Sequence, residues 1–202
     1  MILRIVGGRI GRGRLEPVTE AYTTGYAPVA MGMDGLDHFV VGVRPLGNAH
    51  QLASMTIWLT VEAALAAYDG NLSAKRTLDG RDHGEQLTDV DYYEVEDAVV
   101  HRDGVEPAFL RLTAGSVARG LDADIQQELR RRLGRLPAEL ADGYIGRRVI
   151  GDGVEIAFMS TWSSGTDRAA LEAPIWPEIS SRYDAFRVDL YDVITSGAPG
   201  RI

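Results

Sequence analysis

Cysteine is absent from this chain of 202 residues. The absence excludes disulfides, catalysis by a thiolate, and zinc or iron–sulfur sites that use cysteine ligands. Long apolar runs are also lacking, since none reaches the roughly 18 to 20 residues that a membrane-spanning helix needs. The first residues follow a strand-like pattern and show none of the regions of a secretory signal. We therefore expect a cytoplasmic protein that is stabilised by packing or association.

Basic residues are fewer than acidic ones, and the formal net charge is -8. Most of the acidic excess lies between Asp69 and Glu106, where 11 residues are acidic and 4 are basic. A chain without a basic stripe is poorly suited to neutralise phosphates, which supply most of the non-specific affinity for nucleic acids. The basic run from Arg130 to Arg132 is expected to be a solvated helix face. The composition thus argues against a nucleic-acid partner.

The chain contains an internal repeat, in which residues 2–13 resemble residues 109–120 at an offset of 107 positions. The matches are Leu3/Leu110, Arg4/Arg111, Ile5/Leu112, Gly8/Gly115, Ile10/Val117, Arg12/Arg119 and Gly13/Gly120. So many matches in one register indicate a fold that is present twice. We predict one copy over residues 1–100 and a second over 107–195, with a linker at 101–106 and a tail at 196–202.

Each copy shows the order strand, helix, hairpin, helix, strand, which is typical of a ferredoxin-like unit. The helix at 16–30 is the least regular element, because Gly25 and Pro28 are expected to break or kink its far end. Residues 156–162 are largely apolar on both faces, so we predict an α+β fold whose two antiparallel sheets pack face to face as a barrel. The predicted strands are 2–10, 37–44, 51–58, 90–96, 109–117, 144–150, 154–162 and 186–194, and the other helices are 61–68, one from 122, 166–172 and 177–183.

Two tryptophans and two tyrosines recur at equivalent places in the copies. Trp58 and Trp162 close the third strand before a helix with a polar cap, and Tyr93 and Tyr191 lie in the last strand. With the strand order, these residues make the chain resemble the dimeric α+β barrel superfamily, and within it the antibiotic biosynthesis monooxygenase-like group. In that family the two copies usually come from two subunits. The resemblance implies a cofactor-independent monooxygenase-like enzyme that acts on a small aromatic or polyketide-like substrate.

The same group includes haem-degrading oxygenases, which share an asparagine on the first strand and a tryptophan and a histidine on and after the second helix. Here the first-strand position holds Val6 or Thr113, and Ala67 and Leu171 stand near the place of the helical tryptophan. His83, in the loop after the second helix of the first copy, is the remaining candidate to contact haem. The resemblance therefore disfavours haem degradation and implies that no cofactor is needed.

Arg4 and Arg111 are the main polar candidates, because each lies on the first strand of its copy. They alternate with leucines that we expect to pack under the helices, so we predict that both arginines point into the barrel interior. Asp91 and Asp189, on the last strands, are their natural partners, since an unpaired interior charge costs several kcal/mol. Either the arginines bind an anionic substrate oxygen, or they form structural ion pairs that repeat with the fold.

The catalytic residues that we predict are His38, Arg4 and Tyr93. His38 starts a strand and would deprotonate a phenol or enol, Arg4 would stabilise the resulting anion, and Tyr93 would donate a proton. The predicted substrate-binding residues are Trp58, Arg111, Trp162, Tyr191 and His83. For the tryptophans and tyrosines, the alternative is a purely structural role in packing.

All four histidines precede the second copy, and none of the pairs has the spacing of a helical zinc site, so no metal site is predicted. His50 and His101 lie near turns and are expected to be solvated. We hypothesise one active pocket, in the first copy, for a small hydrophobic or aromatic molecule. The protein would be a monomer with an intramolecular barrel or a homodimer. The alternative is a non-catalytic small-molecule-binding or interaction protein of the same fold.

Overall fold

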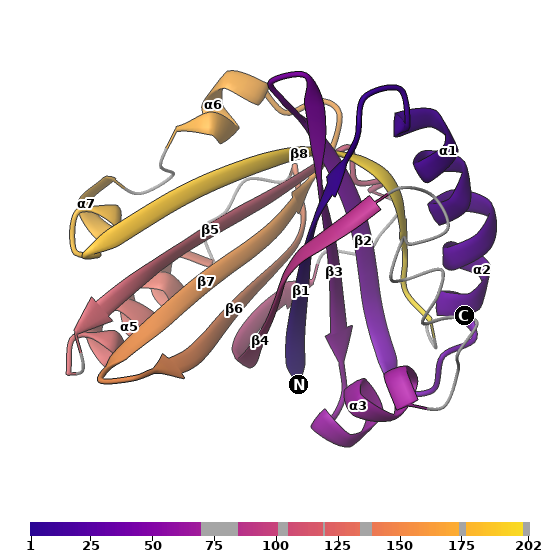
Figure 1. The fold of residues 1–202 in the computed structure, drawn as a ribbon. Coiled ribbons are helices and arrows are strands. Elements are labelled where there is room, and N and C mark those ends of the chain that lie inside the picture. Colours follow the sequence, from indigo (N-terminus) through magenta and orange to yellow (C-terminus); the bar gives the residue numbers. More distant parts are fainter. Residues whose placement is uncertain (70–84, 101–104, 119, 134–138, 174–176, 200–202) are drawn as a thin grey trace. The chain divides into compact units, whose positions relative to one another are not determined.

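The computed structural model describes residues 1–69, 85–100, 105–118, 120–133, 139–173 and 177–199 (Figure 1). The chain divides into two compact units: unit 1 is Met1–Tyr92 with Tyr191–Ile202, and unit 2 is Tyr93–Leu190. The boundaries fall inside two long strands, β4 (Glu85–Val100) and β8 (Ala185–Gly197). Each of these strands therefore contributes one end to each unit.

Unit 1 contains most of the first copy. Its elements are β1 (Ile2–Ile10), α1 (Leu15–Glu20), the π-helix η1 (Ala21–Tyr26), α2 (Ala27–Met31), β2 (Leu36–Leu46), β3 (Ala49–Trp58) and α3 (Val61–Asp69). The antiparallel sheet runs in the order β1, β3, β2 and then the C-terminal end of β8. β2 and β3 form the predicted hairpin, in which Gly47 has a φ of 60° that glycine adopts without strain.

The helix predicted at 16–30 is present as α1, η1 and α2 in succession (Figure 1). Pro28 has no N–H to donate to a preceding carbonyl, and the six residues before α2 form a wider π-helical turn. Within it, the hydroxyl of Thr24 donates to the Glu20 carbonyl at 2.8 Å, and that of Thr23 to the Thr19 carbonyl at 3.0 Å. The predicted break is thus a change of helix type.

The register of unit 1 shows which side chains share a face of the sheet. Ile2 lies opposite Trp58 and Ile10 opposite His50, and residues directly opposite in an antiparallel pair share a face. Ile10 and Trp58 pack in one core with Val18 of α1. The even-numbered residues of β1 therefore lie on the face that the helices cover.

Unit 2 contains most of the second copy. Its elements are β5 (Phe109–Ala118), α5 (Asp122–Leu133), β6 (Leu140–Ile150), β7 (Gly153–Trp162), α6 (Arg168–Glu172) and α7 (Pro177–Ser180). The strand order is the N-terminal end of β8, then β5, β7, β6 and the C-terminal end of β4. Ile125 and Leu129, spaced four residues apart on α5, pack in a core with Val154, Ile156 and Phe158 of β7.

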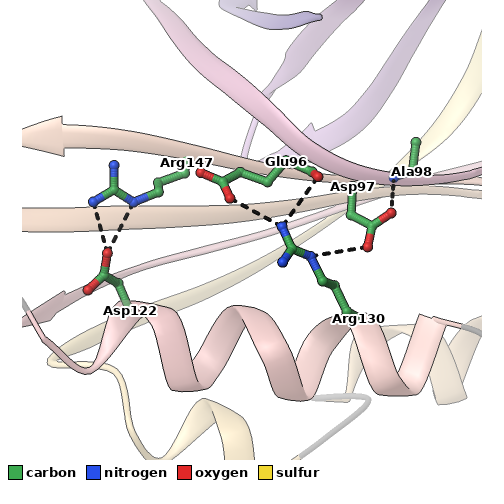
Figure 2. Close-up of polar contacts among 6 residues, drawn as sticks. All are labelled: Glu96, Asp97, Ala98, Asp122, Arg130 and Arg147. Carbon is green, nitrogen blue, oxygen red and sulfur yellow. Dashed lines mark hydrogen bonds and ion pairs between the residues drawn. The ribbon is translucent and has the colours of Figure 1, made fainter.

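Charged side chains tie α5 to the neighbouring strands, as Figure 2 shows. Nη2 of Arg147 in β6 lies 2.8 Å from a carboxylate oxygen of Asp122, in the first turn of α5. Arg130, near the other end, lies 3.4 Å from Glu96 and 3.3 Å from Asp97 in β4. The basic run was predicted to be solvated. Arg130 instead forms ion pairs with β4, although its side chain keeps 47% of its surface exposed.

The structure confirms the α+β class and the β-α-β-β-α-β order of both copies. The last strands are longer than predicted, and β8 continues to Gly197, two residues into the segment predicted as a tail. Face-to-face packing of the two sheets stays a prediction. Residues 101–104 of the predicted linker lie outside the described residues. Within the described part of the chain, no helix has both the length and the hydropathy that crossing a membrane requires.

Candidate active site

Arg111 lies on the helix-covered face of unit 2, so its predicted orientation is wrong. It pairs across the sheet with Ser160, two residues before Trp162, and both neighbours along β5 are buried as well. Its Nε donates to the Leu171 carbonyl at 2.7 Å, and its Nη2 to the Ala173 carbonyl at 2.9 Å. Burial lowers the pKa of Arg111 to about 10, which keeps the guanidinium protonated at neutral pH. Arg111 holds the C-terminal end of α6.

Arg4 occupies the equivalent position in unit 1 and is also on the helix-covered face, opposite Thr56. Its Nε donates to the hydroxyl of Tyr92 at 3.2 Å, and its guanidinium carbon lies 5.8 Å from the centroid of that ring. The orientation failed as a prediction because both faces of β1 and β5 are buried. Alternation of leucine and arginine then does not reveal which face the helices cover.

Trp58 and Trp162 occupy equivalent places in the cores of the two units. The indole N–H of Trp58 donates to Oγ1 of Thr56 at 2.8 Å, and that of Trp162 to Oγ of Ser160 at 2.9 Å. Both rings are buried. These contacts are those of core packing, and the predicted stacking on a substrate stays a prediction.

Two of the predicted catalytic residues, His38 and Arg4, lie on opposite faces of one sheet. His38 is buried in β2 opposite Ile57, which places it on the face away from the helices. Arg4 lies on the other face of the same sheet, and Tyr93 belongs to unit 2. His83 lies outside the described residues. Their joint catalytic role stays a prediction.

Tyr93 and Tyr191 each lie against an arginine on the sheet face away from the helices. In unit 2, the guanidinium carbon of Arg148 is 4.8 Å from the centroid of the Tyr93 ring. Nη2 of Arg148 lies 3.1 Å from Oε2 of Glu155, and the Tyr93 hydroxyl donates to the other oxygen of that carboxylate. The acid holds both groups in place.

In unit 1 the equivalent arginine also lies against a tyrosine, but its hydrogen-bond acceptor is a neutral amide. The guanidinium carbon of Arg44 is 5.1 Å from the centroid of the Tyr191 ring. Nε and Nη2 of Arg44 both donate to the amide oxygen of Gln51, at 2.8 and 2.6 Å. Glutamine thus stands where the second copy has glutamate.

An open groove of about 800 Å³ lies beside the first helical segment of unit 1. It is lined by Gly13, Leu15, Glu16, Thr19, Glu20, Thr23 and His50. The register puts His50 on the helix-covered face, opposite Ile10. The groove therefore combines an imidazole, two carboxylates and two hydroxyl-bearing side chains in a space of typical ligand-site size.

His50 is only partly exposed, so it is less solvated than predicted. Its Nδ1 is buried, and no group among the described residues forms a hydrogen bond with it. Val154 stands at the equivalent place in unit 2, opposite Val117, and is buried in the core with Ile125. Comparison of the two copies at the offset of 104 that relates Trp58 to Trp162 would have revealed this difference.

Among the residues that the structure describes, no three or more histidine, aspartate or glutamate side chains are grouped so that they could hold a metal ion. The groove contains one histidine and two glutamates at its lining. These side chains can transfer a proton and contact an organic ligand.

No protein-family model matches the chain, and no curated protein matches its sequence. Solved structures do match. A putative monooxygenase from Fusobacterium nucleatum subsp. nucleatum is 12% identical with a TM-score of 0.79, over 100% of this chain and 95% of that one. A putative monooxygenase from Lactobacillus acidophilus is 10% identical with a TM-score of 0.60, over 100% and 99%. An anthrone oxidase-like protein is 14% identical with a TM-score of 0.59, over 98% and 94%.

At identities this low, a structural likeness shows the fold. The match extends over the whole of both copies, as the sequence resemblance predicted. The chain therefore has the fold of these monooxygenase-like proteins, with two ferredoxin-like repeats in one polypeptide.

Proposed function

We propose that the protein is a cofactor-independent oxygenase whose substrate, a small aromatic or polyketide-like phenol or enol, binds in the His50 groove. The observation that carries the proposal is the difference between the copies at this position. The second copy has a buried valine, whereas the first has an imidazole with an enclosed nitrogen at the wall of a groove. Buried polar atoms without a protein partner need an explanation, and an imidazole retained at the wall of a groove is suited to act as a general base.

His50 acts as the general base in this proposal. It accepts the phenolic or enolic proton, and the negative charges of Glu16 and Glu20 on the same groove offset the charge of the imidazolium that forms. Leu15 and the methyl groups of the threonines offer apolar contacts for a ring. General-base catalysis contributes about 10² to 10⁴-fold in rate.

Dioxygen is the oxidant. The electron-rich carbon of the deprotonated substrate attacks O₂, and a C–O bond forms to give a peroxide. The imidazolium returns its proton to the outer oxygen of the peroxide. Loss of water then breaks the O–O bond and the remaining C–H bond of that carbon, and a carbonyl remains. The balance is one methylene carbon and one O₂ converted to one carbonyl and one water.

This proposal gives the role of base to His50 instead of His38. Arg4 does not reach the groove, because Ile10 lies six positions further along β1, which is about 20 Å along a strand. An anion stabilised by Arg4 would therefore require a different binding place. The choice between the two histidines is what the experiment must decide.

Air oxidation of anthrone to anthraquinone provides the test, followed by absorbance and by oxygen consumption. We expect the protein to accelerate the reaction, and His50→Val, which copies the second unit, to lower kcat/KM by at least about 100-fold. His38→Gln is the matched comparison on the opposite face and should retain the wild-type rate. Loss of activity in His38→Gln with retention in His50→Val would overturn the assignment of the base.

The competing function is a non-catalytic small-molecule binder, which the openness of the groove favours. Anaerobic titration with anthrone separates the two functions. Binding that depends on His50, with no acceleration of product formation in air, would replace the oxygenase by a binding protein. The absence of both binding and turnover would remove the groove as a site for this substrate class.

A further inference from the structure

Unit 2 has a pocket of about 190 Å³ beside the Tyr93, Arg148 and Glu155 cluster. It is lined by Ala114, Gly115, Ser116, Glu155, Ala185, Phe186 and Arg187. Glu155 is preceded and followed along β7 by Val154 and Ile156, which pack in the core beneath α5, so alternation puts Glu155 on the other face of the sheet. This pocket is separate from the His50 groove.

Opposite charges stand at two sides of this pocket. Leu190 packs with Trp162 in the helix-side core, so alternation along β8 places Arg187 on the same face as Glu155. The strands β7, β5 and β8 are neighbours in that order, and two strand spacings separate the two backbones by about 10 Å. The pocket residues on the strand between them, β5, are small: Ala114, Gly115 and Ser116.

The acid is held in place with acceptor capacity remaining. Each carboxylate oxygen of Glu155 receives one bond, from Tyr93 or from Arg148, and an ionised carboxylate accepts about four in all. The Glu155 side chain is 13% exposed, which limits competition from solvent. Glu155 can therefore bind an ammonium group without losing either of its partners.

Arg187 is held loosely. Its Nε lies 3.9 Å from a carboxylate oxygen of Asp189, and its side chain is 54% exposed. A guanidinium in such a contact can turn to a better acceptor, because exposed ion pairs contribute little to stability. A carboxylate that offers two oxygens to the planar fork of an arginine is such an acceptor.

We propose that this pocket binds a small zwitterion, namely an α-amino acid with a compact apolar side chain. Its ammonium contacts Glu155, its carboxylate contacts Arg187, and Ala114 and Ala185 lie against its side chain. The first copy does not preserve this arrangement, because Gln51 and Arg9 stand where the second has Glu155 and Ser116. The inference concerns a second site and does not depend on the oxygenase proposal.

Isothermal titration with L-valine tests the proposal. The probes 2-methylpropylamine and 3-methylbutanoate are valine without its carboxylate and without its ammonium, respectively. We expect each probe to bind at least about tenfold more weakly than valine. Glu155→Gln, which copies the first unit, and Arg187→Gln should each weaken valine binding by a similar factor.

Two controls keep the result interpretable. His50→Val should bind valine with wild-type affinity, so that loss of the oxygenase activity and loss of this site are distinguishable. Arg187 is exposed, so Arg187→Gln should fold even if Glu155→Gln does not, as circular dichroism will show. The proposal is overturned if wild-type protein shows no valine binding, if either single-charge probe binds as well as valine, or if Arg187→Gln binds valine unchanged.

Discussion

The two copies place an arginine and a tyrosine at the same positions but surround them with different charges. Arg44 bonds to the neutral Gln51, whereas Arg148 bonds to the acidic Glu155. The tyrosine in each case comes from the last strand of the other copy, because β4 and β8 divide between the units. The contact between arginine and tyrosine is therefore kept in both copies, while the acceptor beside the arginine changes from a neutral amide to a carboxylate.

A second difference lies on the helix-covered face. His50 in unit 1 and Val154 in unit 2 occupy equivalent positions, under helical segments of different geometry. Thr23 of the π-helix η1 lines the groove. In unit 2, by contrast, α5 places Ile125 in a core with the side chains of the sheet. π-helical turns occur frequently at functional sites. Where the copies differ, the first has space for a ligand and the second has a filled core.

The largest expected effect comes from moving the histidine into the filled core. Val154→His should lower the free energy of unfolding by about 3 kcal/mol, because a larger polar ring replaces a buried valine. The reverse change, His50→Val, should alter stability by less than about 1 kcal/mol. Urea unfolding measured by circular dichroism checks both. A change below about 1 kcal/mol for Val154→His would mean that the cores are more alike than the structure indicates.

Arg111 and Arg4 provide the next comparison. Arg111→Met removes the donor to two carbonyls at the end of α6 and should cost about 2 kcal/mol. Arg4→Met should cost less, about 1 kcal/mol, because Tyr92 is partly exposed and can bond to water. Thermal unfolding of the two variants measures the ranking. Equal losses would show that the arginines have equivalent roles in both copies.

The anchoring of α5 predicts a pH dependence. The hydrogen bond from Arg147 lowers the pKa of Asp122, together with a backbone N–H bond from Gly120. The contribution of the ionised group is fully present above the ordinary value of about 4 and is lost as pH falls through the lowered pKa of the folded state. Asp122→Asn should therefore reduce stability by about 1 kcal/mol at pH 7 and flatten its decline on acidification.

The control for this prediction is Asp124→Asn in the same helical turn. Asp124 is mostly exposed, and its contact with Arg182 is 3.9 Å long. It should change the pH profile of unfolding less than Asp122→Asn does. A larger change from Asp124 would point to the helix dipole, instead of the Arg147 contact, as the main source of the effect.

Helix caps give the smallest expected effects. Thr60 accepts a bond from the Ala63 N–H at 3.1 Å, and Asp167 accepts one from the Ala169 N–H at 3.0 Å. Alanine at either position should cost about 0.5 to 1 kcal/mol in chemical denaturation. Because the caps serve equivalent helices, a difference of more than about 1 kcal/mol between the two variants would break the correspondence between the copies.

Much of the fold could be predicted because the relevant patterns are local. The spacing of Ile125 and Leu129 marks one face of α5, and Thr60 has the chemistry of a helix cap. Pro28 correctly signalled an irregular helix, although not its π geometry. Strand ends were less predictable, since pairing with β2 extends β8 to Gly197 and no local residue pattern encodes a partner strand.

Less of the candidate site could be predicted. His50 follows a turn in the sequence, and only the packing of α1 and η1 across the sheet encloses it. Arg4 and Arg111 were correctly singled out as buried and polar, but which face they occupy depends on where the helices pack. The partners of Tyr93 come from two other strands and carry no shared sequence motif.

The sequence by itself determined the duplication, the order of elements and the residues that differ between the copies, because repeats, periodicity and turn chemistry are properties of neighbouring positions. The tertiary structure decided which of those differences matter. Register and helix packing placed His50 at a groove and Val154 in a core, and placed Glu155 beside a pocket with Arg187. The physical reason is that burial and charge pairing arise between strands that are distant in the chain.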